Sequence, residues 1–434
     1  MNVKQVAINL ISQVDKGAYS NIALNETFKT LNINSKEKAF MTEIFYGVLR
    51  NKKFLDYIIE KNTKEIKKEW IRNLLRISIY QITFMDSDNK GIVWEATELA
   101  KKYSIAISKF INGTLRNYLR NKDSELKNLA DEKNYEVLYS IPKWFCDILE
   151  KQYGNDNLKQ AITSLKKIPY LSVRVNKLKY SEEEFEEFLK EKDIQIIKKV
   201  DTVYYINLGL IINSEEFKTG KIIAQDASSY LAAKNLEVIP NELVLDICAA
   251  PGGKTAVLAE NMENRGEIIA IDIHQHKIKL IDTNMKKLGI DIVKATVMDA
   301  RNVNKQGRKF DKILVDVPCS GYGVIRKKPE ILYSKNRESV EELAKLQLEI
   351  LNSAADILKD GGELIYSTCT ITDEENTNNI KKFLEDRKEF KVEKLYIPEN
   401  VSGDYDKLGG FCINYKEEIM DNFYIIKLVK GEKC

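Results

Sequence analysis

The feature that most constrains the fold is a series of short apolar runs in the second half of the chain, separated by segments with helical spacing. The runs are LVLDI at 243–247, EIIAIDI at 267–273, KATVM at 294–298, KILVDV at 312–317 and ELIYST at 363–368. Apolar strands that alternate with helices are typical of a parallel, doubly wound α/β sheet. Such a sheet places its chemistry at the carboxyl ends of its strands, so the residues after each run are candidates for function.

Two further regions precede this α/β part. From residue 3 to about 118 the apolar residues recur at helical spacing, which predicts an all-helical domain. Residues 121–134 are polar and charged, and we place a domain boundary near 135. The strand-like runs LSVRVN at 171–176 and VYYINL at 203–208 enclose an acidic amphipathic helix, which predicts a small α+β linker module. The predicted domains are 1–135, 136–224 and 225–434.

Composition excludes several classes of protein. The 434 residues contain no apolar run of the length that a membrane span needs, and Asp and Gln interrupt the first fifteen residues, MNVKQVAINLISQVD. We therefore expect a cytoplasmic protein without a membrane partner. The only histidines are His274 and His276, and the six cysteines form no CxxC pair, so neither histidine chemistry nor a structural metal site is indicated. We expect reduced thiols.

Positive charge is concentrated at the start of the chain. Residues 1–140 hold 23 Lys+Arg and 17 Asp+Glu, a net of +6, which leaves −3 of the total of +3 for the rest. This density suits binding to a phosphate backbone, although a solvated lysine-rich surface is the alternative. The basic residues that suggest it are Arg50, Lys52, Lys53, Lys64, Lys67, Lys68, Arg72 and Arg76.

A Gly-rich turn follows the first apolar run, in the sequence LDICAAPGGKTAVLAE. Gly252 and Gly253 let the backbone approach a ligand closely, and the helix expected from Thr255 offers free N–H groups at its start. This turn predicts a small-molecule site. GGKT also ends like a phosphate-binding loop, but the residue six positions before Lys254 is Cys248 rather than Gly, so that interpretation fails. A turn with a purely structural role is the remaining alternative.

An aspartate stands at the end of each of the next two runs. Asp272 closes the second run, 26 residues after Asp246 (272 − 246). An acidic residue at this place in an α/β sheet can bind the hydroxyls of a ribose. Asp299 follows the third run similarly. Both aspartates could instead cap the next helix, because Asp is a common capping residue.

Two cysteines follow the last two runs. VDVPCSG contains Asp316 and Cys319, and IYSTCT contains Cys369, 50 residues later (369 − 319), with a helix expected from about 338 to 358. If these runs are neighbouring parallel strands, both thiols lie at the edge of the sheet that carries the Gly-rich turn. The other cysteines, Cys146, Cys412 and Cys434, are interpreted as small buried residues or left unassigned.

At these residues the chain resembles the RNA cytosine-C5 methyltransferases, which use S-adenosylmethionine (SAM). The resemblance covers about 141–430 and rests on CAAPGGKT, AIDI, DVPCSG with GVIRKKPE, and YSTCTITDEEN. The first third resembles the helical RNA-binding NusB-type domain through DKGAYSNIALNE, FMTEIFYGVLRNKKFLDYII, LLRISIYQITFM and FINGTLRNYLR. The combination is similar to bacterial enzymes that methylate one cytosine of 16S rRNA. It implies a Rossmann-like SAM-dependent methyltransferase domain preceded by a NusB-like domain.

The resemblance implies a role for each matched residue. Cytosine C5 is a poor nucleophile, so a thiolate must first add at C6, and Cys369 falls at this nucleophile. Cys319 falls at the thiol that helps to release the product, Asp316 at the N3/N4 edge of the cytosine, and Lys254 at a position that orients the base or lowers a thiol pKa. The residues implied to bind SAM are Cys248, Ala249, Ala250, Pro251, Gly252, Gly253, Lys254, Asp272 at the ribose, Asp299 near the adenine, and Asp316.

A structured 16S rRNA would have to present its cytosine unstacked, with the helical domain and the linker module holding the surrounding RNA through phosphates and shape. Arg326, Lys327 and Lys328 follow the Cys319 motif and are candidate RNA contacts, with a solvated loop as the alternative. The chain departs from the family pattern in two places: Asn422 replaces the Gly of Asp-Gly-Phe-Phe, and Lys328 stands where His is frequent.

Three other functions stay open at this point. The target could be a cytosine of another rRNA or of a tRNA, or the chain could be an RNA-binding ribosome assembly factor without turnover. The third is DNA cytosine methylation, in which Cys319 itself would be the nucleophile; the additional Cys369 favours RNA. We expect a monomer.

Overall fold

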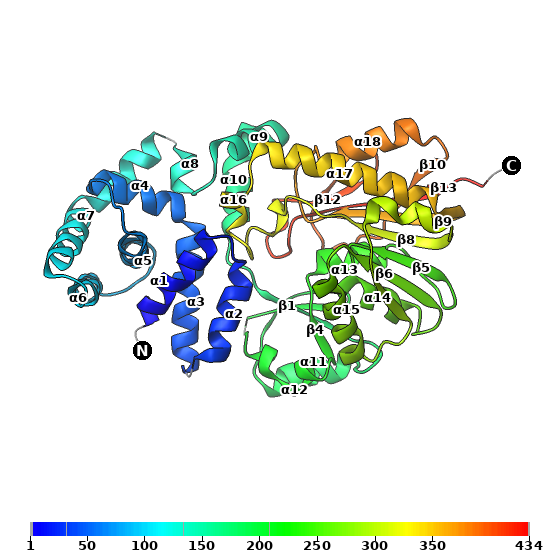
Figure 1. Cartoon of the computed structure of the whole chain (residues 1–434), viewed down its shortest axis with the longest axis horizontal. Helices are drawn as coiled ribbons and strands as arrows, with labels where there is room; N and C mark the ends of the chain where they lie inside the picture. The colour runs from blue at the N-terminus through cyan, green and yellow to red at the C-terminus, as the bar shows by residue number, and fades with distance from the viewer. Residues whose placement is uncertain (1–2, 32, 133, 208, 433–434) are drawn as a thin grey trace. The chain divides into compact units, whose positions relative to one another are not determined.

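The computed structural model describes residues 3–31, 33–132, 134–207 and 209–432 of the chain. Its contacts divide the molecule into two compact units (Figure 1). The first unit runs to Lys166 and also contains Lys327–Ser334. The second unit contains Lys167–Arg326 and resumes at Lys335. A short segment that follows the Cys319 motif therefore belongs to the first unit.

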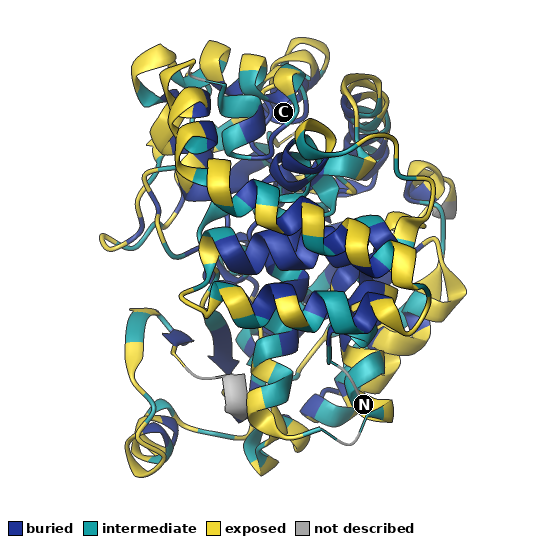
Figure 2. Ribbon diagram, turned by 90° about the vertical axis from the view of Figure 1, so that its left-hand side faces the viewer, coloured by how far each residue is buried: buried dark blue, intermediate teal, exposed yellow. Residues whose placement is uncertain are grey.

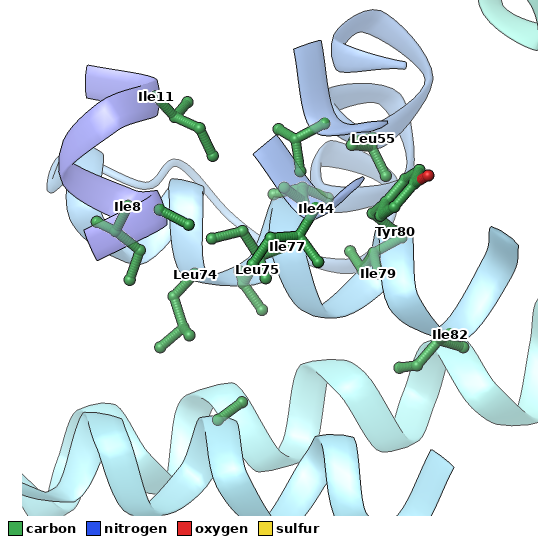
Figure 3. Packing of buried hydrophobic residues seen from close by; sticks show 14 of the residues in the cluster. Ile8, Ile11, Ile44, Leu55, Leu74, Leu75, Ile77, Ile79, Tyr80 and Ile82 are labelled. Atoms are coloured by element: carbon green, nitrogen blue, oxygen red, sulfur yellow. The ribbon is translucent and has the colours of Figure 1, made fainter. Parts of the chain in front are cut away.

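The first unit is helical, as the apolar spacing predicts. Its helices are α1 (Val3–Asp15), α2 (Ser20–Thr30), α3 (Ser35–Arg50), α4 (Lys52–Asn62), α5 (Glu69–Phe84), α6 (Asn89–Lys101), α7 (Ile105–Asp131), α8 (Tyr135–Leu138), α9 (Lys143–Tyr153), α10 (Asn155–Lys166) and α16 (Ile331–Ser334). Helix α5 is central and contacts α1, α3, α4, α6 and α7. Leu74, Leu75, Ile77 and Ile79 are buried on different sides of it, as expected of a helix surrounded by others (Figure 3). Figure 2 shows exposed residues on the outward sides of these helices.

The polar segment 121–134 does not end the helical part. Helix α7 continues through this segment to Asp131, because Leu129 is buried and Lys122 Nζ donates to the carbonyl of Ile82 at 3.0 Å. Most of the charged residues between 121 and 131 lie on the exposed side of a long helix, although Glu125 is buried. Composition alone does not distinguish such a helix from a linker. Helices α8, α9 and α10 follow within the same unit. The boundary near 135 stays a prediction.

The second unit begins with the small α+β module. Strands β1 (Leu171–Val175), β2 (Ile196–Val200), β3 (Val203–Ile206) and β4 (Ile222–Ala224) form an antiparallel sheet in the order β2-β3-β1-β4. Helix α11 (Glu182–Glu191) starts with a capping box between Ser181 and Glu184. It buries Phe185 in a cluster with Val173 and Tyr204 of the sheet, as the amphipathic pattern predicts.

The main sheet contains all five predicted strands. They are β5 (Leu243–Ile247), β6 (Glu267–Asp272), β7 (Val293–Val297), β8 (Phe310–Asp316) and β9 (Leu358–Thr368), which pair in parallel in the order β7-β6-β5-β8-β9. The remaining strands, β10 (Phe390–Glu393), β11 (Asp404–Tyr405), β12 (Phe411–Ile413) and β13 (Phe423–Lys430), extend the sheet beyond β9 with antiparallel pairing. Chain order reverses on either side of β5, and ligands of such sheets bind at this switch point.

Alternate residues of the central strands face two separate hydrophobic layers. Val244 and Leu314 join a cluster with α13 (Ala227–Lys234), α14 (Gly253–Asn261) and α15 (Gln275–Leu288). Their neighbours Leu245 and Val315 join a cluster with α17 (Arg337–Asp356) and α18 (Thr377–Asp386). Figure 1 shows the two groups of helices on opposite faces of the sheet. The result is the predicted doubly wound α/β fold with both faces of the sheet covered, but the antiparallel strands beyond β9 make the sheet mixed instead of purely parallel.

None of the helices within the described ranges is long and apolar enough to cross a membrane. In the part of the chain that the structure describes, no group of three or more His, Cys, Asp or Glu side chains is arranged to hold a metal ion.

Candidate active site

The Gly-rich turn joins β5 to α14 at the switch point of the sheet. Gly252 caps α14 with a φ of +99°, a left-handed conformation that suits glycine, and a Cβ there would lie 2.9 Å from Met285 Cε. The first N–H groups of α14 have no partner within the helix, so they are available to a ligand. Residues 248–254, which the resemblance assigns to SAM, thus form one continuous turn with donors at its end.

Two buried polar atoms beside this turn have no partner among the described residues. Gln225 Oε1 accepts from Arg174 Nε at 2.6 Å, but Gln225 Nε2 is unsatisfied and lies 3.5 Å from where a Cβ on Gly253 would stand. Asp246 Oδ2 accepts from Thr255 Oγ1 at 2.6 Å, whereas Asp246 Oδ1 is unsatisfied. Burial raises the pKa of Asp246 to about 7. Proteins rarely leave such groups unpaired, and a donor and an acceptor together fit the amino-acid end of SAM.

The two predicted ribose and adenine residues stand at the ends of β6 and β7. Asp272 accepts from the His274 N–H at 3.1 Å, and Asp299 caps a 3₁₀ turn through the Arg301 N–H at 3.0 Å. The hydrogen bond from the Arg301 guanidinium lowers the pKa of Asp299. Asp299 therefore also acts as a local cap, whereas the N-cap of α15 is His274 and Asp272 instead forms an ion pair with Lys277. Ile273 and Val297 beside them are 53% and 42% exposed, an apolar surface that suits an adenine ring.

Three side chains, Lys254 of the turn, Asp316 of β8 and Ser367 of β9, form a hydrogen-bonded network. Asp316 Oδ2 accepts from Lys254 Nζ at 2.8 Å, and Asp316 Oδ1 accepts from Ser367 Oγ at 2.8 Å. Burial lowers the pKa of Lys254, but the charges of Asp316 and Cys369 outweigh it, and the net effect is a raised pKa. Lys254 is therefore a cation that is paired with Asp316 and interacts electrostatically with Cys369.

The two predicted thiols meet at this network. Cys319 Sγ lies 2.9 Å from Cys369 Sγ, because parallel pairing of β8 and β9 brings the residues after both strands to one edge. The hydrogen bond to Cys369, together with burial, raises the pKa of Cys319 well above its usual value. This shift favours the protonated form of Cys319, and either sulfur can be the donor in the contact between the two thiols. The structure brings the two sulfurs together, and the separate roles of Cys319 and Cys369 stay predictions.

The other described cysteines lack such partners. Burial raises the pKa of Cys248 to about 12, that of Cys412 to about 12 and that of Cys146 to about 11. A thiol with a raised pKa is a poor nucleophile because the thiolate is the reactive form. All five described cysteines are free thiols, as expected. Cys434 lies outside the described residues.

One prediction about basic residues is wrong, and a second applies to fewer residues than the sequence suggested. The Arg326 side chain is not an RNA contact: it is 1% exposed and donates to the carbonyls of Glu417, Glu418 and Met420. In the helical unit, four of the eight residues that suggested a phosphate site form ion pairs with acidic side chains, and a fifth is largely buried. Lys52 pairs with Asp15, Lys53 with Glu136, Arg72 with Asp56 and Glu60, and Arg76 with Asp15 and Asp56, while Arg50 is largely buried.

Sequence reasoning missed several polar residues of the site. Gln225 stands before α13 and far from any motif, so no sequence signal marks it. Ser367 is the last-but-one residue of β9 and becomes relevant only because it pairs with Asp316 across the sheet. Glu375 was part of the quoted YSTCTITDEEN, but nothing in the sequence indicated its partners.

The strand order, the Gly-rich turn at the switch point and the acidic strand ends define the class of Rossmann-like methyltransferases. Three family models match the chain in succession. They are the NusB family over residues 1–120, the ferredoxin-like domain of RsmF/B-like methyltransferases over 141–214, and the 16S rRNA methyltransferase RsmB/F over 233–429. The chain therefore belongs to the RsmB/F family of SAM-dependent rRNA methyltransferases, and it is of the RsmB/Sun type.

Relatives match almost the whole length of the chain. The probable ribosomal RNA small subunit methyltransferase B of Bacillus subtilis is 34% identical over 92% of each chain. Ribosomal RNA small subunit methyltransferase B of Shewanella oneidensis is 32% identical over 99% of this chain and 100% of its own. The crystal structure of PH0851 superposes with a TM-score of 0.84 at 30% identity, and it covers 100% of this chain and 99% of that one.

Proposed function

We propose that the protein transfers a methyl group from SAM to C5 of one cytosine in 16S rRNA, through a covalent adduct between Cys369 and C6 of that cytosine. The observation that carries the proposal is the thiol pair, with Cys319 Sγ 2.9 Å from Cys369 Sγ and the Lys254–Asp316 ion pair beside it. SAM, when bound, supplies an electrophilic methyl group. Residues 248–254, Asp272, Asp299 and the unsatisfied atoms of Gln225 and Asp246 would hold it.

The side chains of the site would act on the cytosine. The Cys369 thiolate adds at C6, and the electron pair of the C5–C6 double bond makes C5 nucleophilic. Asp316 accepts a hydrogen bond from the cytosine amino group, and the Lys254 cation balances the charge of the attacking sulfur. After C5 gains the methyl group it loses its proton to a base, and the bond between C6 and Cys369 breaks to restore the double bond. Cys319 keeps its proton and donates a hydrogen bond to the departing sulfur.

The helical unit still offers a basic surface for RNA. Lys61 and Lys64 at the end of α4 and Arg116 and Arg120 on α7 are exposed and form no ion pair with any described residue. Asn117 Nδ2 donates to Asn62 Oδ1 at 2.7 Å, which brings the two segments together. We propose that this surface binds phosphates of the rRNA. Substituting Arg116 and Arg120 with Ala is expected to weaken RNA binding several-fold and to reduce its salt dependence, whereas Lys52→Ala, which breaks an internal ion pair, should change neither.

The experiment that tests the function uses labelled SAM. Purified protein is incubated with unmodified 16S rRNA, with small subunits that lack the modification and with tRNA, and the labelled base is mapped. We expect label at C5 of one 16S cytosine, no label with Cys369→Ala, and a trapped RNA adduct with Cys319→Ala. Label found only in tRNA would show that the substrate is tRNA and not 16S rRNA. Absence of transfer to every RNA would contradict it and favour an assembly factor. The three-domain division and the monomeric state stay predictions.

A further inference from the structure

A buried carboxylate connects the two cysteine loops. Glu375 lies between β9 and α18 and is 0% exposed. Its Oε1 accepts from the Ser320 N–H and from Gln347 Nε2, each at 2.8 Å. Its Oε2 accepts from Ser320 Oγ at 2.5 Å and from Thr372 Oγ1 at 2.7 Å. Ser320 follows Cys319 directly and Thr372 belongs to the loop of Cys369, so one side chain holds both loops.

The direction of these hydrogen bonds follows from the donors available. The Ser320 hydroxyl has a single proton, which it donates to Glu375, so Thr370 must donate in the 2.7 Å contact between Thr370 Oγ1 and Ser320 Oγ. Thr370 directly follows Cys369. The residues after each cysteine are therefore linked to each other and to the same carboxylate.

Two amide side chains, those of Gln347 and Asn376, form hydrogen bonds with the residues next to each cysteine. Gln347 Nε2 also donates to the carbonyl of Pro318 at 2.9 Å, so the residues before and after Cys319 are both fixed. Asn376 accepts from Thr368 Oγ1 at 2.6 Å and donates to the carbonyl of Thr370 at 3.2 Å, which fixes both neighbours of Cys369. Neither Gln347 nor Asn376 contacts a cysteine sulfur in the hydrogen bonds described.

Burying a carboxylate is costly unless it is compensated. No Lys or Arg of the described residues forms an ion pair with Glu375, and its compensation comes from hydrogen bonds alone. Three of these four bonds come from the two cysteine loops themselves. A hydrophobic residue could fill such a site without this penalty, so the carboxylate has a use other than packing.

We propose that Glu375 is a positioning residue for the reaction: it sets the separation of the Cys319 and Cys369 sulfurs by tying together the loops that carry them. The proposal rests on the proposed function, in which these thiols act as donor and nucleophile. Glu375 forms no hydrogen bond with either sulfur, although its charge contributes to the raised pKa of Cys319, and its burial keeps it from RNA. Its loss should therefore lower kcat and leave the KM for RNA almost unchanged. A displacement of about 1 Å in a reacting group can cost about 100-fold in rate, which is the loss expected of Glu375→Ala.

The test needs a measure of thiol separation that does not depend on RNA. Dibromobimane reacts with two nearby thiols, each of which displaces one bromide, and peptide mapping identifies the pair that it joins. In the wild type it should join Cys319 to Cys369, and Cys319→Ala provides the background. Glu375→Ala should lose this cross-link together with kcat. Glu375→Gln should retain most of both, because its oxygen can still accept from the two N–H donors while its amide donates to the hydroxyls of Ser320 and Thr372.

The matched control is Glu374→Ala, which removes the neighbouring, half-buried glutamate and should change neither measurement. If Glu375→Ala does not fold, Thr372→Val removes one of the four donors and should show a smaller loss of both. A normal cross-link in the variants would overturn the proposal, even if kcat fell. If the wild type methylates no RNA, the proposed function fails, while the cross-link still decides whether Glu375 positions the thiols.

Discussion

The Gly-rich turn after β5 and the cysteine loops after β8 and β9 lie at the same edge of one sheet, but their polar groups differ in how far they are satisfied. At the turn, Gln225 Nε2 and Asp246 Oδ1 are buried and have no hydrogen-bond partner in the part of the chain that the structure describes. At the cysteine loops, Glu375 accepts four hydrogen bonds, and the free thiols of Cys319 and Cys369 are hydrogen-bonded to each other. The first region leaves contacts for a ligand to complete, whereas the second is arranged before a substrate arrives. A loop that binds a ligand can thus leave polar groups unpaired for that ligand, whereas a loop that carries reacting groups fixes their positions in advance.

The largest effect is expected at the cysteine loops after β8 and β9, which we call the reactive region; the Gly-rich turn after β5 is the binding region. Cys369→Ala removes the nucleophile and should reduce methyl transfer by on the order of 10⁴-fold or more, as measured with labelled SAM in single-turnover assays. Cys412→Ala removes a half-buried thiol on β12 and serves as the control, with an expected change of less than about twofold. If activity survives in Cys369→Ala, the nucleophile is misassigned and Cys319 becomes the candidate.

The pH dependence of stability tests the unsatisfied carboxyl at the turn. The pKa of Asp246 is raised from 3.8 to about 7, so the folded state holds the proton more tightly than the unfolded state. This contribution is complete below about pH 4 and is lost as the pH rises to about 7. It amounts to at most about 4 kcal/mol.

We therefore expect the unfolding free energy of the wild type, from urea titrations, to fall across this range relative to Asp246→Asn. The exposed Asp282→Asn is the control and should follow the wild type. SAM should reduce the decline if its ammonium group pairs with Asp246. An equal decline in Asp246→Asn would show that another group is responsible.

Lys254→Met tests whether the two regions are coupled. Lys254 belongs to the turn but pairs with Asp316 of the reactive region at 2.8 Å. Its removal leaves the carboxylate without its cation and withdraws positive charge from Cys369, so we expect kcat to fall by about 100-fold, or about 2.7 kcal/mol. The affinity for SAM, measured by calorimetry, should change much less. A larger loss of SAM affinity than of kcat would place Lys254 in the binding region alone.

Gln225→Glu gives the smallest effect of this series. The variant keeps an oxygen to accept from Arg174 but replaces the unsatisfied amide donor with an acceptor. If that donor binds SAM, the affinity should fall by about tenfold or more, because one hydrogen bond is lost and the new carboxylate repels the acceptor group that the amide bound. Calorimetric titration with SAM measures it, with the exposed Gln195→Glu as the matched change elsewhere. Unchanged affinity in Gln225→Glu would remove Gln225 from the SAM site.

The sequence predicted much of the fold because its signals are local and periodic. The five apolar runs correspond to β5–β9, and the amphipathic helix from Ser181 corresponds to α11. The sequence was wrong about Arg326. It also could not show that four of the eight basic residues named in the helical unit are paired, because ion pairs such as that of Arg76 with Asp56 join residues on different helices. A count of charges cannot distinguish an exposed cation from a paired one.

For the site, the sequence by itself determined which residues are available and at which strand ends they stand: Cys319 after β8, Cys369 after β9 and the Gly-rich turn after β5. These follow from chain order and from the rule that parallel strands end at one edge. Only the tertiary structure decided that the two sulfurs lie 2.9 Å apart, that Lys254 pairs with Asp316, and that Glu375 joins both loops. These contacts depend on distances between segments far apart in the chain, and folding sets those distances.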